Sequence, residues 1–353
     1  MQHPYKALPD RHFWGRSVSR DFAPEALVAG SAPLVTRGEA VMSAGSCFAA
    51  NIVPYLERAG FAYVRTEQPH PAFAKIHREA LGYHKFSAAY GNLYTTRQLL
   101  QLLQRARGTF RPVEDRWHED GQVIDPFRPG LAFPATSDAE FDALTRQHLD
   151  RVLAAVEAAD VFVFTLGLTE AWVSGIDGAV FPACPGTVRG RFNPSLHRFQ
   201  NFRVAEVGAD LLEAIRLLRG IRRRLRVILT VSPVPLVATA TPDHVLLATT
   251  YSKSVLRVAA QEATASLPDI TYFPAYEIVT GPQAPWDFFE PDRRDPSRAA
   301  IDAVMGAFLS ACRGARAAPA RPAKAAPAAA PEPGAPPPTS LADLECEEAA
   351  SAR

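Results

Sequence analysis

Short runs of consecutive apolar residues recur along the chain and predict five β-strands. They are Glu39–Ala44, Phe61–Thr66, Val161–Leu166, Arg226–Ser232 and Ile270–Pro274. The third run, VFVFTL, shows no alternation of apolar and polar residues. Strands covered on both faces of a parallel sheet have this pattern, whereas strands with one wet face alternate. The pattern therefore favours a parallel sheet between two layers of helices.

Helical periodicity fills the intervals between these runs. The predicted helices are Cys47–Ala59, Thr96–Arg107, a helix that ends at Ala159, Val204–Leu218, Ser252–Ser266 and a last helix that starts at Pro296. Ser137 and Glu140 have the spacing of a capping box. Asn201 is a candidate N-cap for the fourth helix, and Asp295 for the last. Strands separated by helices imply βαβ units, so we expect an α/β fold with a doubly wound parallel sheet of about five strands.

The composition of the chain changes near residue 313 and predicts the end of the folded part. From Arg313 onward the 353-residue chain is rich in alanine and proline, and it includes the run Pro336–Pro338. Such a segment cannot bury enough apolar surface to offset its ordering entropy. We predict an N-terminal extension over residues 1–30, one α/β domain over residues 31–312 and a disordered tail over residues 313–353. The tail is also a candidate docking segment for a protein partner.

The balance of charge gives no electrostatic reason to bind nucleic acid. Lysine plus arginine number 38 and aspartate plus glutamate 37, so the formal net charge at pH 7 is +1. The chain does not open with an apolar run of signal-peptide kind. No later stretch approaches the roughly 20 apolar residues of a membrane-spanning helix. We expect a cytoplasmic protein that neither spans a membrane nor binds nucleic acid.

Metal chemistry has little support in the sequence. No CxxC pair occurs among the four cysteines, which favours neither a zinc site nor a disulfide framework. His70, His77 and His84 recur every seven residues. At helical rise, neighbours in this series lie about 10 Å apart, too far to share one metal ion. Surface or capping histidines are the better interpretation.

Polar residues follow the predicted strands at the points where a binding site is expected. Ligands of open α/β sheets bind beyond the carboxyl ends of the strands. The segments at these ends are Gly45-Ser46-Cys47-Phe48, Gly167-Leu168-Thr169-Glu170, Pro233-Val234-Pro235 and Ala275-Tyr276-Glu277. We predict that these loops converge on one cleft.

Ser46 is the candidate nucleophile of this cleft. It lies between a strand end and a helix start, where backbone N–H groups favour negative charge. The alternative is that its hydroxyl caps the helix, since serine is a preferred N-cap. The neighbouring Cys47 is expected to be a buried small side chain. The chain contains no GxSxG, GxxxxGK[ST] or GxGxxG motif after the first strand, so neither an α/β-hydrolase elbow nor nucleotide binding is indicated.

An ordered series of segments resembles the GSCFA family. Gly45-Ser46-Cys47-Phe48-Ala49 is the motif that names this family. The other similar segments are GNLYTT at 91–96, TLGLTEAW at 165–172, HRFQN at 197–201, TVSPVP at 230–235, YSKSVL at 251–256 and YFPAYE at 272–277. The resemblance covers about residues 38–310.

The GSCFA family in turn resembles the SGNH/GDSL-like hydrolases and the PC-esterases. That resemblance implies a three-layer, flavodoxin-like fold and activity on esters, often acyl groups of glycans, without a metal or organic cofactor. It implies Ser46 as the nucleophile, with the backbone N–H groups of Ser46 and Gly91 and the Asn92 amide as oxyanion donors. The usual Gly-x-Asn-Asp is replaced by Gly167-Leu168-Thr169-Glu170, so Thr169 occupies the asparagine position.

The chain departs from the SGNH pattern before its last helix. Where Asp-x-x-His is expected, the sequence has Asp292-Arg293-Arg294-Asp295. A serine needs an adjacent base, and a solvated carboxylate is a weaker base than imidazole by roughly two pKa units. Asp292 or burial would raise the pKa of Asp295. The alternatives are that Asp295 only caps the helix, or that His197 or His244 replaces the missing base.

Three functions remain open at this stage. The first is an ester hydrolase or acyltransferase that uses Ser46 on an acylated glycan or small ester. The second is a degenerate glycan- or ligand-binding protein, and the third is a scaffold that uses the tail. Glu170 and Glu277 form a further candidate acid–base pair if they lie about 5–10 Å apart. Candidate aromatic contacts to a sugar are Trp172, Tyr251, Tyr276 and Trp286.

Overall fold

The computed structural model describes residues 3–20, 22–68, 83 and 85–313. His70, His77, His84 and the tail from residue 314 onward lie outside these ranges. The predictions made for them, and the boundaries predicted for the tail, therefore stay predictions. Near the N-terminus, short helical turns occur at Pro4–Ala7, Asp10–His12, Trp14–Ser17 (α1) and Pro24–Leu27.

The centre of the described structure is a five-stranded parallel sheet, as predicted. Its strands are β1 (Ala40–Gly45), β2 (Ala62–Tyr63), β5 (Val161–Leu166), β9 (Arg226–Val231) and β10 (Ile270–Tyr272). Their spatial order is β10-β9-β5-β1-β2. The chain leaves β1 toward β2 on one side and later returns to β5 on the other, so the order reverses between β1 and β5. This is the flavodoxin-like order, and its switch point is where ligands bind.

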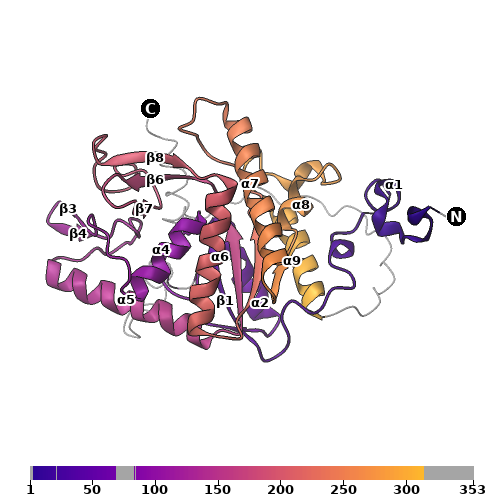
Figure 1. Ribbon diagram of the computed structural model, residues 1–353, viewed down its shortest axis with the longest axis horizontal. Coiled ribbons are helices and arrows are strands. Elements are labelled where there is room, and N and C mark those ends of the chain that lie inside the picture. Colours follow the sequence, from indigo (N-terminus) through magenta and orange to yellow (C-terminus); the bar gives the residue numbers. More distant parts are fainter. Residues whose placement is uncertain (1–2, 21, 69–82, 84, 314–353) are drawn as a thin grey trace, which may run out of the picture.

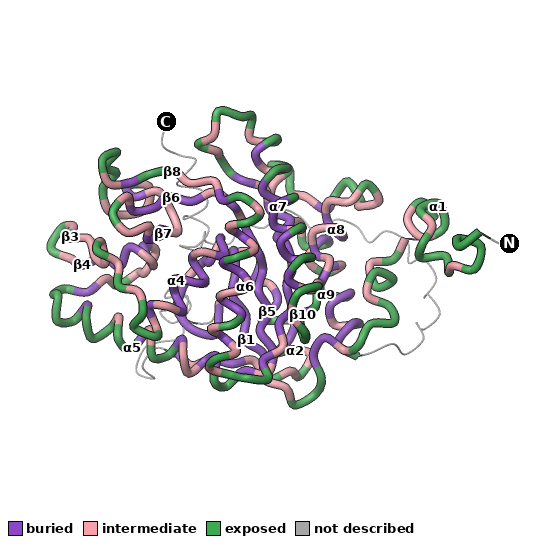
Figure 2. Tube along the Cα trace, viewed as in Figure 1, coloured by how far each residue is buried: buried purple, intermediate pink, exposed green. Residues whose placement is uncertain are grey.

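Alternate side chains of the strands pack against two separate helix layers. Phe162 and Phe164 of β5 face one layer, and Val161 and Val163 face the other. The first layer contains α4 (Thr96–Ala106), α5 (Asp138–Ala158), α6 (Val204–Ile221) and α7 (Val245–Ser266). The second contains α2 (Ile52–Arg58), α8 (Ala275–Thr280) and α9 (Arg298–Arg313). Figure 2 shows the continuous buried centre that results, and the predicted three-layer, doubly wound fold is confirmed.

The first predicted helix divides into two parts in the structure. A 3₁₀ turn, η4 (Cys47–Asn51), comes first, and α2 follows it. Pro54 explains the division, because it lacks the N–H that an α-helix beginning at Cys47 needs to bond the Ala50 carbonyl. The nucleophile candidate therefore precedes a tight turn rather than a regular α-helix.

Two predicted N-caps are wrong. Asn201 is the last residue of β8 (His197–Asn201), and α6 begins only after Arg203. The last helix, α9, begins at Arg298 rather than Pro296. The Ser297 hydroxyl accepts a hydrogen bond from the Ala300 N–H at 3.4 Å, so Ser297 and not Asp295 takes the capping role.

Two small antiparallel elements lie outside the main sheet, and the apolar runs did not predict them. One is the three-stranded sheet of β6 (Glu170–Ser174), β7 (Val180–Phe181) and β8, in the order β7-β6-β8. The other is the hairpin of β3 (Trp117–Glu119) and β4 (Gln122–Ile124). In Figure 1 both lie beside α4 and α5, away from α8 and α9.

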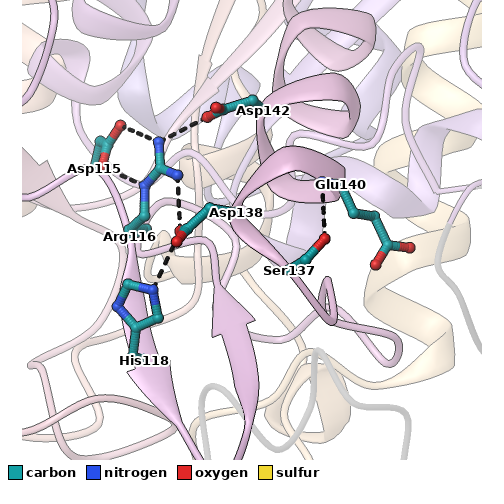
Figure 3. Close-up of polar contacts among 7 residues, drawn as sticks. All are labelled: Asp115, Arg116, His118, Ser137, Asp138, Glu140 and Asp142. Carbon is teal, nitrogen blue, oxygen red and sulfur yellow. Dashed lines mark hydrogen bonds and ion pairs between the residues drawn. The ribbon is translucent and has the colours of Figure 1, made fainter.

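Hydrogen bonds from Arg116 to three aspartates join the hairpin to the start of α5 (Figure 3). Arg116 donates to Asp115 at 2.9 Å, to Asp138 at 3.0 Å and to Asp142 at 2.7 Å. These carboxylates raise the pKa of Arg116 above its ordinary value. Ser137 caps α5, because its hydroxyl accepts from the Glu140 N–H at 3.2 Å. The predicted capping box is incomplete, since the Glu140 carboxylate accepts from the Thr136 N–H at 2.7 Å instead of the Ser137 N–H. The Arg116 hydrogen bonds form a surface contact that fixes the hairpin against the helix.

Candidate active site

A cavity of about 320 Å³ lies where the loops after β1, β5 and β9 meet. Ser46 and Cys47 follow β1, Gly167 and Leu168 follow β5, and the segment 232–240 follows β9. The small sheet supplies another wall through Glu170, Ala171, Trp172, Phe181 and Phe199. The predicted convergence of these three loops is therefore observed. The segment Ala275-Tyr276-Glu277 forms α8 instead and does not line this cavity.

Two glycines bring Ser46 close to the end of β5. Gly45 has a φ of +146°, and a Cβ there would lie 2.5 Å from the carbonyl oxygen of Thr165. A Cβ on Gly167 would lie 3.2 Å from the Cβ of Ser46. Glycine avoids strain in the backbone geometry of Gly45, and the missing Cβ of Gly167 leaves room for the close approach of Ser46. The two strand ends therefore hold Ser46 directly against Gly167.

A loop before α4 fastens these strand ends together. The Leu93 N–H donates to the Gly45 carbonyl at 2.8 Å. The Tyr94 carbonyl accepts from the N–H groups of Gly167 at 3.1 Å and Leu168 at 2.8 Å. Thr95 then opens α4 through a capping box with Gln98. Backbone hydrogen bonds thus fix the floor of the cavity on both sides of Ser46.

The hydroxyl of Ser46 is buried without a hydrogen-bond partner. The residue is 3% exposed, and it occupies the N-cap position of η4. Its side chain makes no capping hydrogen bond, and the Oγ has no acceptor or donor in the described structure. The alternative that Ser46 merely caps the helix is therefore wrong. A buried polar atom left unpaired costs about 1–3 kcal/mol, which a ligand in the cavity can offset.

Lys253 contacts the cavity residue Gly167 and was not among the candidates from the sequence. It is 1% exposed, and its Nζ donates to the Gly167 carbonyl at 2.7 Å. Burial lowers the pKa of this ammonium to about 7, and the charge of Arg294 lowers it further while Cys47 opposes the shift. The signal was available, because Lys253 lies on the buried face of α7 with Leu256 and Ala260.

Because the pKa of Lys253 is lowered to about 7, we expect the free energy of unfolding to rise with pH just above neutrality. The unfolded chain keeps the ordinary lysine pKa of 10.5, so above pH 7 it binds a proton that the folded protein has released. The free energy of unfolding is expected to increase by roughly 2 kcal/mol between about pH 7 and pH 8.5. Urea titrations across this range measure the change. Lys253→Met is expected to abolish the slope, and parallel curves for the two proteins would refute the assignment.

Arg294 lines the cavity, whereas the Asp-x-x-His pattern placed the base one residue later, at Asp295. Its Nη1 donates to the Asp295 Oδ1 at 3.0 Å, and its Nε is buried without a partner. Asp292 accepts from the backbone N–H groups of Arg294 and Asp295 at 2.9 and 3.0 Å, which forms a local turn. Asp292 and Asp295 are exposed and do not line the cavity.

Neither candidate histidine reaches this cavity. His197 was expected in a loop, but it lies in β8 and is 3% exposed. Its Nε2 lies 3.1 Å from Glu114, and its Nδ1 accepts from the Asn193 N–H at 3.0 Å. His244 caps α7, with its Nδ1 accepting from the Leu246 N–H at 3.2 Å. Both rings have structural contacts where they stand.

Most expected oxyanion and substrate residues lie outside the cavity lining. Asn92 donates to the Tyr94 hydroxyl at 3.0 Å, and Thr169 donates to Asn201 at 2.8 Å. Glu277 accepts from Arg257 at 2.9 Å. The residues named from the sequence that do not line the cavity are Gly91, Asn92, Thr169, Tyr251, Tyr276, Glu277 and Trp286. Gly167 does line it, but its N–H already donates to Tyr94.

Glu170 and Trp172 are the expected residues that the structure brings into the wall. The Glu170 carboxylate accepts from the Thr239 hydroxyl at 2.7 Å, and burial raises its pKa above the ordinary value. Trp172 packs edge-on against Phe199, with ring centroids 5.8 Å apart. The wall therefore combines one carboxyl group with an aromatic surface.

The described residues contain neither a metal-binding cluster nor a helix suited to span a membrane. No three histidine, cysteine, aspartate or glutamate side chains within the described ranges come together as a metal site. The helices of the same ranges include none with the length and apolar character to cross a bilayer.

The fold and the cavity define an α/β protein with a buried serine at the switch point of its sheet. The model of the GSCFA family matches residues 40–308, and the chain belongs to that family. No curated protein matches it. Among solved structures it is similar to a carbohydrate esterase family 3 from Talaromyces cellulolyticus, with 10% identity, a TM-score of 0.35 and coverage of 76% of this chain and 94% of that chain. A family 3 carbohydrate esterase of Clostridium thermocellum has 10% identity, a TM-score of 0.32 and coverage of 78% and 94%.

Proposed function

We propose that the protein is an ester hydrolase or acyltransferase in which Ser46 is the nucleophile. The observation that carries the proposal is the unpaired, buried Oγ of Ser46 on the floor of a cavity of about 320 Å³. In the reaction, Oγ bonds to the ester carbonyl carbon, and the alcohol leaves with a proton. Water, or a second alcohol in the case of acyl transfer, then releases the acyl group from Ser46.

The proton of Ser46 requires an acceptor, and we assign this role to Lys253. Asp295 and His197 were the candidates from sequence, but Asp295 is exposed and both ring nitrogens of His197 already have partners in Glu114 and Asn193. Lys253, like them, is not among the lining residues, but it is buried against the carbonyl of Gly167, which is. Lys253 lies across Gly167 from Ser46, and its pKa of about 7 leaves a large neutral fraction at and above neutral pH. Serine–lysine pairs are one of the known variants of the serine triad. Their hydrogen bonds often tighten only when substrate binds.

The substrate in this proposal is an acylated glycan or another small ester. The cavity volume is at the lower end of the range typical of small-molecule sites. Trp172 and Phe199 give its wall the aromatic surface that apolar faces of sugars pack against. No metal or organic cofactor takes part in the proposed chemistry.

A binding protein without turnover is the second candidate function. Histidine is absent from the described residues of the cavity lining, although it is the usual partner of a nucleophilic serine. In that case the unpaired Ser46 hydroxyl would bind a ligand rather than attack it.

Labelling with a fluorophosphonate probe separates the two functions. We expect the probe to modify Ser46, identified by peptide mapping, with a rate that falls as the pH drops below 7. Ser232 is an internal control because it lines the same cavity while its hydroxyl accepts from the Val234 N–H at 3.3 Å. Absence of labelling in folded protein would favour the binding function. Labelling of Ser232 instead would refute the assignment of Ser46.

A further inference from the structure

The cavity presents a cationic side chain whose hydrogen-bonding capacity is only partly used. Arg294 and Glu170 are the charged residues among the described cavity-lining positions. Arg294 uses Nη1 to contact Asp295, whose side chain is 52% exposed. Its Nε is buried and has no partner. A guanidinium binds carboxylates and phosphates through two parallel hydrogen bonds, and Nε is a donor of Arg294 that such a group can use.

The electrostatic surroundings of this guanidinium favour a negative group. Burial lowers the pKa of Lys253, and the positive charge of Arg294 lowers it further. Burial raises the pKa of Glu170, the one carboxyl group among the described cavity-lining residues, and its carboxylate already accepts a hydrogen bond from Thr239. The exposed Asp295 neutralises Arg294 only weakly, because water screens such a pair.

Two unsatisfied buried atoms belong to this one cavity. Ser46 Oγ can donate and accept a hydrogen bond, and Arg294 Nε can only donate. Leaving a charged donor buried and unpaired is costly, so the arrangement is explained if a ligand supplies the acceptor. An ester with a second, anionic group can place its carbonyl at Ser46 and its charge at Arg294.

We infer that the cavity takes esters that carry an anionic oxygen group, a carboxylate or a phosphate, and that Arg294 binds this group. The inference rests on the proposed function and narrows its substrate class. Arg294 selects the substrate and does not itself react.

A matched pair of esters tests the selection. Mono-4-nitrophenyl succinate carries a carboxylate, whereas 4-nitrophenyl methyl succinate has the same acyl chain without the charge. Wild-type protein is expected to prefer the anionic ester, and Arg294→Gln to lower the ratio of the two kcat/KM values about 10- to 100-fold. Arg293→Gln is the control, because the neighbouring Arg293 is exposed and stacks on Trp286, with its Cζ 3.7 Å from the ring centroid.

The outcomes of this experiment are distinct. A ratio that Arg294→Gln leaves unchanged within about threefold would overturn the inference, even if both rates fall. Equal losses for the two esters would mean that Arg294 acts on the reacting carbonyl. If wild-type protein hydrolyses the neutral ester without preferring the anionic one, the proposed function stands and the inference fails.

A binding measurement keeps the inference testable if neither ester is hydrolysed. Titration calorimetry of the Ser46→Ala protein with succinate and with inorganic phosphate reports the anion site without any reaction. We expect binding of at least one of the two anions, and loss of that binding in the Ser46→Ala/Arg294→Gln protein. The better ligand distinguishes carboxylate from phosphate recognition. No binding, or binding that survives the loss of Arg294, would overturn the inference.

Discussion

Replacement of Ser46 by alanine is expected to lower kcat/KM for an activated ester by about 1,000-fold or more. The hydroxyl supplies the oxygen that forms the acyl bond in the proposed reaction. The substitution removes an oxygen that has no hydrogen-bond partner, so the free energy of unfolding should stay the same or rise. Hydrolysis of 4-nitrophenyl acetate and urea unfolding of the same samples measure both effects.

Ser232→Ala provides the matched comparison for this loss. Ser232 is 1% exposed and lies in the same cavity, but its Oγ is already engaged by a backbone N–H. Its removal is expected to reduce kcat/KM by less than about tenfold, because it alters the lining without removing the nucleophile. Substantial turnover by the Ser46→Ala protein would refute serine chemistry at this position.

Replacement of Gly45 by alanine is expected to destabilise the fold by about 3–5 kcal/mol. The new Cβ would lie 2.5 Å from the oxygen and 2.8 Å from the Cβ of Thr165, and the φ of +146° is itself unfavourable for alanine. Gly45 pairs with Thr165 in the parallel sheet, so relief requires β1 and β5 to separate. Urea unfolding measures the loss.

Gly60→Ala serves as the control for the backbone component. Gly60 also has a positive φ, +79°, but an added Cβ there would meet nothing within 4 Å. Its expected cost is about 1 kcal/mol, since only the left-handed conformation is penalised. Equal losses for the two variants would show that contact with Thr165 contributes little at Gly45.

The fold was predictable because its signals are local and strong. Val161–Leu166 was located to the residue, since a strand buried on both faces has an uninterrupted apolar sequence. The strands β6 to β8 were missed because each is short, and their residues carry neither a long apolar run nor a clear alternation. Their pairing is decided by contacts between distant segments, which no local pattern records.

The sequence predicted which loops form the candidate site, because sheet topology places them, but not which side chains enter it. The rule that ligands bind at the carboxyl ends of parallel strands placed Ser46, Gly167 and Glu170 in one cavity. The choice between Arg294 and Asp295 depends on a turn in which Asp292 accepts two backbone hydrogen bonds. The burial of Lys253 depends on how α7 meets the loop after β5. Both are tertiary details that spacing along the chain does not encode.

The cavity has a floor and walls that differ in how firmly they are held. Backbone hydrogen bonds fix the floor, from Leu93 to Gly45 and from Gly167 and Leu168 to Tyr94. The floor that holds Ser46 is continuous with the main sheet and cannot shift without loss of strand pairing. The walls belong to the small sheet and to the segment 232–240, which lie outside the main sheet. Proteins built on this plan can therefore diversify their ligands while the reactive atom keeps its position.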